Sequence, residues 1–214
     1  PQDAGRDTMP GLSWTAVLDC SPDGQHLVSS GRSGEITVWS VQSASAVRST
    51  QAFSSMLGSV QYTDSGRTIM TAERGSRVRF WDADTLTMLE EIDVGFRAHG
   101  HRTVDAECSR DGQFVLVVFE DGEAHDYERN THGQVLYLPP GTVGHNGGAF
   151  LGKNGAVLTA GGTSLSLWED RKPRRVGRLP LALTDDILGL SVSPDGTSAA
   201  VALKNKVRVY RNLR

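Results

Sequence analysis

The sequence predicts an all-β fold, a β-propeller of five four-stranded blades, because two kinds of landmark recur with the same period. The first is a turn glycine, found in steps of 42, 46, 43 and 41 residues at Gly24, Gly66, Gly112, Gly155 and Gly196. The second is an aromatic residue that closes a strand pattern, in steps of 42, 46, 41 and 42 residues at Trp39, Trp81, Tyr127, Trp168 and Tyr210. A period of roughly 40–45 residues with several strands per unit is typical of propeller blades.

The first repeat shows the pattern that the others follow. An apolar stretch beginning at Val17 leads into the turn Ser-Pro-Asp-Gly at residues 21–24, and a second strand is expected over residues 25–30. A glycine-flanked turn then precedes a third strand that ends at Trp39, and residues 44–53 are expected to form the outer strand. Period-two alternation bounded by Gly, Pro and Asp is the sequence signal of a strand, and we find no segment with a helical period.

The later repeats keep this order, with two departures. Most third strands alternate cleanly, with apolar pairs at Ile36/Val38, Val78/Phe80, Leu165/Leu167 and Val207/Val209. In repeat three, Asp126 stands at an apolar position, so its third strand is weakly patterned. The long connection at residues 95–102 accounts for the 46-residue step.

We expect a single domain whose repeats cover approximately residues 12–53, 54–96, 97–139, 140–181 and 182–214. Residues 1–11 are a candidate closing outer strand, because residues 4–11 resemble the segment at 175–181 and the chain stops four residues after Tyr210. Pairing both ends of the chain in one blade would remove an exposed sheet edge. A portion of a larger propeller is the alternative, and self-association is then possible.

The composition of the chain limits the classes of partner that we expect it to bind. The 22 basic and 25 acidic residues give a formal net charge of -3, which argues against a protein that coats nucleic acid or an anionic membrane. No apolar run approaches the roughly 18 residues of a membrane helix, and the first residues carry no signal-peptide pattern. Cys20 and Cys108 occupy equivalent positions two blades apart, beyond disulfide reach, so we expect two small buried residues and a cytoplasmic protein.

The repeats resemble the WD-repeat family. The resemblance rests on Ser-Pro-Asp-Gly at residues 21–24 and 193–196, Gly-His at 100–101 and 144–145, and Trp-Asp at 81–82. It implies a rigid platform that binds a protein or peptide without catalysis or cofactor, used as a scaffold or sensor module of a larger signalling or regulatory protein. The family often joins a His, a Ser/Thr, the Trp and a turn Asp in one network, of which this sequence keeps the turn Asp only as Asp121.

Polar residues of the first strands are expected to face the central channel. They lie five and seven residues before the turn glycines, at Asp19, Gln61, Glu107, Phe150 and Ser191, and at Val17, Ser59, Asp105, Gly148 and Gly189. Because Asp19, Asp105 and Glu107 bring carboxylates near the axis, the alternative function is a metal-dependent, lactonase-like propeller hydrolase. Blades four and five offer few ligands, so we favour a wet polar tunnel, no enzyme and no metal.

Two further clusters do not change this interpretation. His99 and His101 flank a glycine in a loose arrangement that the Gly-His dipeptide already explains, so no metal site is expected. The basic run at residues 171–175 lacks interleaved aromatic residues and is interpreted as a solvated loop, so no nucleic-acid partner is expected.

The remaining candidates lie on one rim of the predicted ring, where the linkers before each first strand meet the turns between second and third strands. Loops on a rigid scaffold commonly carry binding function, and aromatic and Arg side chains often dominate interface energies. The partner-binding residues predicted on this rim are Trp14, Arg32, Arg74, Phe96, Arg97, His99, Arg102, Glu120 and Lys204.

Overall fold

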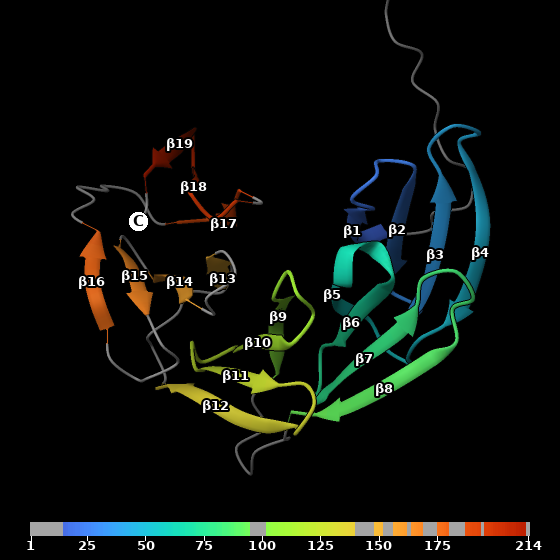
Figure 1. Ribbon diagram of the computed structural model, residues 1–214, viewed down its shortest axis with the longest axis horizontal. Coiled ribbons are helices and arrows are strands. Elements are labelled where there is room, and N and C mark those ends of the chain that lie inside the picture. Colours follow the sequence, from blue (N-terminus) through green and yellow to red (C-terminus); the bar gives the residue numbers. More distant parts are fainter. Residues whose placement is uncertain are drawn as a thin grey trace, which may run out of the picture.

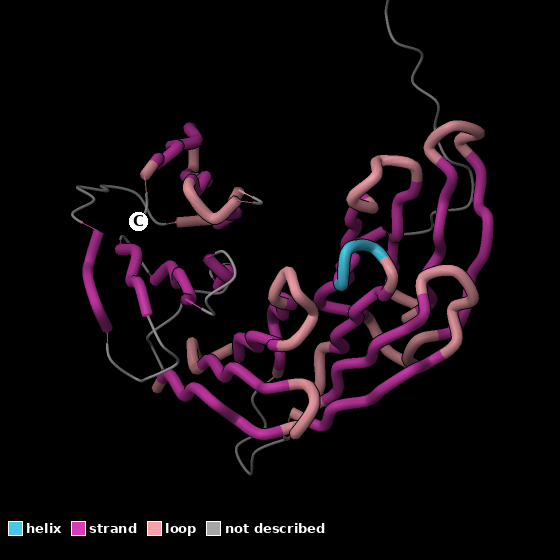
Figure 2. The backbone as a smooth tube through the Cα atoms, in the orientation of Figure 1, coloured by secondary structure: helices cyan, strands magenta, loops and turns pink. Residues whose placement is uncertain are grey.

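The computed structural model describes residues 15–94, 102–139, 148–151, 156–161, 164–168, 175–179, 187–193 and 195–212. These residues form five antiparallel sheets that follow one another around an arc, as expected for a β-propeller (Figure 1). A single-turn 3-10 helix, η1 (Asp64–Gly66), is the one helical element of the described residues (Figure 2). The predicted all-β class and five-blade architecture are confirmed.

The first three blades each contain four strands in sequence order. Blade one consists of β1 (Thr15–Cys20), β2 (His26–Gly31), β3 (Glu35–Ser40) and β4 (Ser45–Gln51). Blade two consists of β5 (Leu57–Thr63), β6 (Thr68–Glu73), β7 (Arg77–Asp82) and β8 (Met88–Asp93). Blade three consists of β9 (Thr103–Cys108), β10 (Phe114–Phe119), β11 (Ala124–Glu128) and β12 (Gly133–Leu138).

Blade four also has four strands, whereas blade five has three among the described residues. Blade four consists of β13 (Gly148–Leu151), β14 (Ala156–Gly161), β15 (Ser164–Trp168) and β16 (Arg175–Leu179). Blade five shows three strands among the described residues, β17 (Gly189–Val192), β18 (Ser198–Leu203) and β19 (Lys206–Arg211). Residues 1–11, the candidate closing outer strand, lie outside the described residues, and that assignment stays a prediction.

The Ser-x-Asp-Gly turns owe their repetition to local hydrogen bonding. In the first turn the Ser21 hydroxyl donates to Asp23 Oδ1 (2.5 Å) and accepts from the His26 N–H (2.9 Å), while the Gly24 N–H donates to the Ser21 carbonyl (2.8 Å). Gly24 has a φ of 70°, in the left-handed region where glycine costs least. The turns at Ser109 and Ser193 repeat these bonds, so this motif specifies the hairpin between first and second strands.

The aromatic residue at the end of the third strand is also fixed by a hydrogen bond. The indole N–H donates to a second-strand hydroxyl in three blades: Trp39 to Ser29 (2.8 Å), Trp81 to Thr71 (2.9 Å) and Trp168 to Thr159 (2.8 Å). In blade three the Tyr127 hydroxyl takes this place and donates to the Val94 carbonyl (2.8 Å). The Trp-to-Ser/Thr part of the family network is therefore present, although the sequence led us to expect it mostly absent.

The third strand of blade three forms despite its weak pattern. Asp126 is fully buried in β11 and is paired in register with Leu116 and Leu136. Its neighbours His125 and Tyr127 are also buried, and His125 Nδ1 lies 2.9 Å from the Tyr127 hydroxyl. Packing between two apolar strands of the sheet thus overrides the local polarity of the sequence.

Neighbouring blades pack face to face, so each internal blade is covered on one face by the preceding blade and on the other by the following blade. Between blades one and two, Val28 and Val38 of one sheet meet Tyr62 and Trp81 of the next in a single buried cluster. The next interfaces repeat this arrangement around Phe80 and Val115, and around Leu116 and Phe150. We call the face toward the following blade the trailing face and the opposite one the leading face.

The two end faces of the array are exposed. On the leading face of blade one, Leu18 is 66% exposed, whereas its equivalent Val60 in blade two is 7% exposed. On the trailing face of blade five, Val207 is 66% exposed, whereas its equivalent Val78 is fully buried. Figure 1 shows the sheet of β17–β19 and the sheet beginning at β1 facing each other across the opening of the arc. Leu18 and Val207 therefore lack the cover that their equivalents in blade two receive.

This difference predicts unequal costs for one substitution at two equivalent positions. Val78→Ala removes two buried methyl groups and should lower the free energy of unfolding by about 2 kcal/mol. Val207→Ala removes the same groups from an exposed side chain and should change stability by less than about 0.5 kcal/mol. Urea denaturation followed by tryptophan fluorescence measures both values. Equal losses in the two variants would show that the trailing face of blade five is covered in solution.

Candidate functional site

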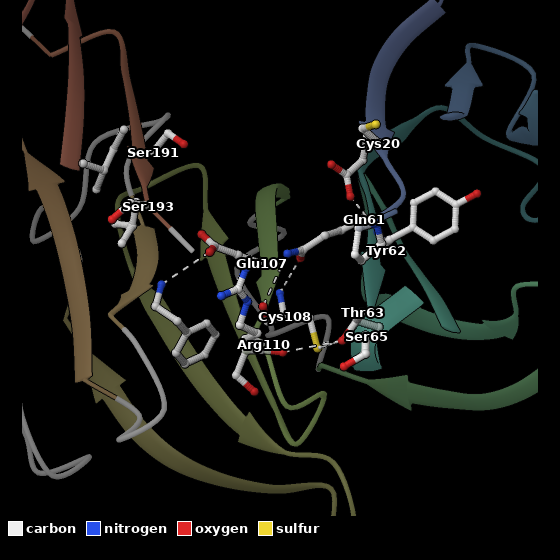
Figure 3. A pocket seen from close by; sticks show the side chains of 16 residues that line it. Cys20, Gln61, Tyr62, Thr63, Ser65, Glu107, Cys108, Arg110, Ser191 and Ser193 are labelled. Carbon is white, nitrogen blue, oxygen red and sulfur yellow. Dashed lines mark hydrogen bonds between the residues drawn. The ribbon is translucent and has the colours of Figure 1, made fainter. Parts of the chain in front are cut away.

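A polar cavity of about 780 Å³ lies between the first strands of the blades. Its walls come from β1, β5, β9, β13 and β17, and Figure 3 shows Gln61, Glu107 and Ser191 around it from three different blades. A second cavity of about 280 Å³ shares Asp19, Gln61 and Glu107 with the first. The expected polar channel is therefore present along the axis of the described blades.

The polar first-strand residues bind the next blade. Asp19 Oδ2 accepts from the Tyr62 N–H (2.7 Å), Gln61 Oε1 accepts from the Cys108 N–H (2.8 Å), and Glu107 Oε1 accepts from the Phe150 N–H (3.4 Å). These three side chains occupy equivalent register positions in blades one to three. We call this set of contacts the inter-blade clasp. It satisfies backbone donors on the inner strand of each following blade, which has no further strand to pair with.

The clasp has a second row nearer the start of the strands. The Ser59 hydroxyl donates to Asp105 Oδ1 (2.9 Å) and accepts from the Ala106 N–H (2.8 Å). Asp105 thus has a structural partner in the preceding blade.

Blade four corrects the expected channel positions. Counting from Gly155 placed Phe150 and Gly148 with the channel-facing residues, but the strand register aligns Ala149 with Glu107 and Phe150 with Cys108. Phe150 is buried against blade three, and a Cβ added at Gly148 would lie 2.5 Å from Leu116 Cδ2. Because alanine has no hydrogen-bonding side chain, blade four cannot contribute a clasp residue at this position.

Burial in the clasp raises the pKa values of the carboxyl groups. Desolvation, with the neighbouring Asp105 charge, raises the pKa of Glu107 to about 8, although the hydrogen bond from Phe150 opposes the shift. Desolvation also raises the pKa values of Asp19 and Asp105 above their ordinary range, against hydrogen bonds from Tyr62 and Ser59 respectively. Glu107 is accordingly mostly protonated at neutral pH.

The metal-dependent alternative finds no support in this geometry. Asp19, Asp105 and Glu107 are each engaged by a neighbouring blade. Within the described ranges, no group of three or more His, Cys, Asp or Glu side chains is placed to hold a metal ion. His99 and His101 lie outside those ranges, as does the basic run over residues 171–174.

The two cysteines are free, and they differ in exposure. Cys108 is buried at the interface of blades two and three, where the Thr63 hydroxyl donates to its sulfur (3.2 Å) and burial raises its thiol pKa to about 12. Cys20 is exposed, contrary to the expectation of two buried thiols, because it lies on the uncovered leading face of blade one.

The described residues of the predicted rim lie at one end of the strands. Arg32, Arg74, Glu120 and Lys204 lie in the turns between second and third strands of four blades, and all four are exposed. Arg102 immediately precedes β9, and its carbonyl accepts from the Glu120 N–H (2.9 Å), which brings these two residues together. We call these five residues the rim surface.

The other predicted rim residues are not described by the structure. Trp14, Phe96, Arg97 and His99 lie outside the described residues. The rim was predicted from the position of each turn within the repeat. The clasp could have been predicted from the polar residue that recurs five positions before the turn glycine in the first three repeats.

Comparison with known proteins agrees with the fold. The family model for the WD domain, G-beta repeat, matches residues 12–40, which contain β1, β2 and β3. The small ribosomal subunit protein RACK1 of Schizosaccharomyces pombe is 28% identical over 113 residues, covering 50% of this chain and 35% of that protein. The aligned region thus spans about a third of the length of that relative.

These findings confirm the resemblance to the WD-repeat family, with divergent repeats arranged as propeller blades. No helix in the described part of the chain is long and apolar enough to cross a membrane.

The raised pKa of Glu107 predicts how stability depends on pH. Folded chains keep a proton that unfolded chains release above about pH 4.5, so the free energy of unfolding falls as pH rises from about 4.5 to 8. The slope from this group is at most about 1.4 kcal/mol per pH unit. Glu107→Gln keeps an oxygen acceptor for the Phe150 N–H and should remove that slope in denaturation curves at several pH values.

Glu35→Gln is the matched control, because Glu35 is exposed and lies away from the channel. Its pH profile should follow the wild-type profile. A Glu107→Gln profile with the wild-type slope would mean that Glu107 is ionised in the folded chain.

Proposed function

We propose that this chain is a non-catalytic scaffold that docks a protein or peptide partner on its rim surface. It would act as a sensor or scaffold module of a larger signalling or regulatory protein in the cytoplasm. The observation that carries the proposal is the placement of five exposed, mostly cationic side chains at one end of a rigid array: Arg32, Arg74, Arg102, Glu120 and Lys204.

Rigidity supports this use of the rim. The turns that carry Arg74 and Glu120 connect strands whose own residues, Ala72, Val78, Phe119 and Ala124, are at most 4% exposed. A partner that binds there meets side chains whose backbone is already fixed, so less ordering entropy is lost on binding. Long Arg side chains on such turns suit bidentate contacts with carboxylates.

The same family likeness supports a protein partner over a small-molecule substrate. The relative that covers half of this chain is itself a ribosomal protein by name, and so a component of an assembly. The channel carboxylates, which an enzyme would need, are used to join the blades. The rim is therefore the stronger candidate for function.

A charge-reversal variant tests the rim surface. Arg74→Glu with Arg102→Glu should weaken binding of a captured partner by about tenfold or more, because each Arg would lose its ion pair and gain repulsion. The immobilised chain is used to capture proteins from its own host, and the affinity of the enriched partner is then measured by calorimetry. Circular dichroism should show that the variant keeps its fold.

Phe96→Ala with Arg97→Ala provides a separate test of the long connection before β9. Arg67→Glu is the control for both variants, because Arg67 lies exposed at the opposite end of the strands of blade two. Unchanged affinity in both rim variants, with both folded, would remove the rim from the interface.

A further inference from the structure

A small pocket of about 170 Å³ lies between blades one and two, at the end of the strands opposite the rim surface. At roughly 30 Å³ per water molecule it has room for about five waters. Its lining includes Val38, Arg48, Tyr62 and Ala83, together with Asp23 and Asp84. We call it the blade one–two pocket.

At the next interface, between blades two and three, one long side chain fills the equivalent space. Arg129, the first residue after β11, has its guanidinium carbon 3.7 Å from the centre of the Phe80 ring. Its Nε donates to Glu90 Oε2 of β8 (2.6 Å), and its Nη1 donates to the Gly112 carbonyl (3.0 Å). An ion pair between neighbouring blades therefore closes this position.

The strand registers align the two interfaces residue by residue. Arg48 of β4 stands at the position of Glu90, since each pairs with the residue just before the closing tryptophan of the third strand. Ala83 stands at the position of Arg129, since each follows the third strand and donates its N–H to the residue before the second strand. The blade one–two pocket thus exists where alanine replaces the long Arg side chain, and the charge on the outer strand is reversed.

Arg48 is held in place through one of its nitrogen atoms. Its Nη1 donates to the carbonyls of Ala83 (2.7 Å) and Asp84 (2.6 Å). Among the described residues no acceptor bonds Nε or Nη2, and these two atoms form the guanidinium edge that can bind a carboxylate through two hydrogen bonds. The Asp84 carboxylate lies 3.7 Å from Nη1 and its side chain is 98% exposed, so this contact contributes little.

The Tyr62 hydroxyl is a second donor at the blade one–two pocket. Figure 3 shows the Tyr62 ring pointing away from the channel and from the Gln61 side chain. No hydrogen bond joins this hydroxyl to another residue in the described part of the chain, although Tyr62 is only 8% exposed. Desolvation raises the pKa of Tyr62 to about 12, against the charge of Arg48, so the hydroxyl keeps its proton at neutral pH.

Two carboxylates restrict the ligands that suit this pocket. Asp23 and Asp84 both line it, and both residues are exposed. Their negative charges oppose a dianion such as a phosphate group, and they favour a singly charged carboxylate with basic groups beside it.

We propose that the blade one–two pocket binds the carboxylate of a Glu or Asp side chain of a partner protein, in a segment with basic residues on either side. The carboxylate accepts from Nε and Nη2 of Arg48 and from the Tyr62 hydroxyl. This arrangement is the ion pair of Glu90 and Arg129 with the charges exchanged and the acid supplied by another chain. The site lies at the opposite end of the strands from the rim surface, so it is independent of the proposed function.

The probe is the peptide acetyl-Gly-Lys-Glu-Lys-Gly-amide, titrated into the whole isotope-labelled chain while the backbone N–H signals of Ala83 and Asp84 are followed by NMR. We expect saturable binding at least tenfold tighter than that of the same peptide with Gln in place of Glu, because the neutral amide loses the charge-assisted bonds. Arg48→Gln should remove the binding. Tyr62→Phe should weaken it by about tenfold, because one donor to the carboxylate is lost.

Ala83→Glu supplies the acid from within the chain. Since Arg129 reaches Glu90 from the equivalent position, the introduced carboxylate should reach Arg48, raise the midpoint of urea denaturation and abolish peptide binding. Arg32→Gln is the matched control, because Arg32 is exposed on the rim, and binding should stay within about twofold of wild type. The rim variant Arg74→Glu with Arg102→Glu should also bind the peptide unchanged, which separates this site from the proposed function.

Equal binding of the Glu and Gln peptides, or wild-type binding by a folded Ala83→Glu chain, would overturn the proposal. Tyr62→Phe keeps the test decisive if Ala83→Glu does not fold, since it removes only a hydroxyl that bonds no described residue. Sodium propionate carries the same carboxylate without the basic neighbours. If propionate binds as tightly as the peptide, the ligand is a small free carboxylate and the protein partner is excluded.

Discussion

The structure depends on the packing of one blade face against the next. A blade in this chain is a thin sheet with apolar side chains on both sides, and each internal blade is covered on both faces by its neighbours. Val28 and Val38 are covered by Tyr62 and Trp81, and the same pairing is repeated along the array. Repetition of one interface explains why diverged repeats still give one architecture.

The inter-blade clasp adds polar specificity to that packing. Strands at the channel cannot gain another strand, and Asp19, Gln61 and Glu107 supply the acceptors that their neighbours lack. This role also accounts for carboxylates that resemble a metal site when the sequence is considered alone. A buried carboxyl group with a raised pKa serves here to join sheets.

The candidates for function are therefore the surface regions that do not take part in packing between blades. The rim turns expose charged side chains, such as those of Arg74 and Glu120, on a framework of buried strands. Such a framework holds binding residues in place without moving, which suits a scaffold. On the outer faces of blades one and five, Leu18 and Val207 are exposed because no neighbouring blade covers them in the described residues.

The sequence alone predicted the five blades within this chain, the turns and most strands, because turn chemistry and period-two alternation are local properties. It did not determine that Phe150 faces blade three, that Cys20 is exposed or that Asp126 is buried in a strand, since each depends on a neighbouring sheet. Only the tertiary structure showed that Asp19 and Glu107 bind the next blade, because the donors Tyr62 and Phe150 are 43 residues away along the chain.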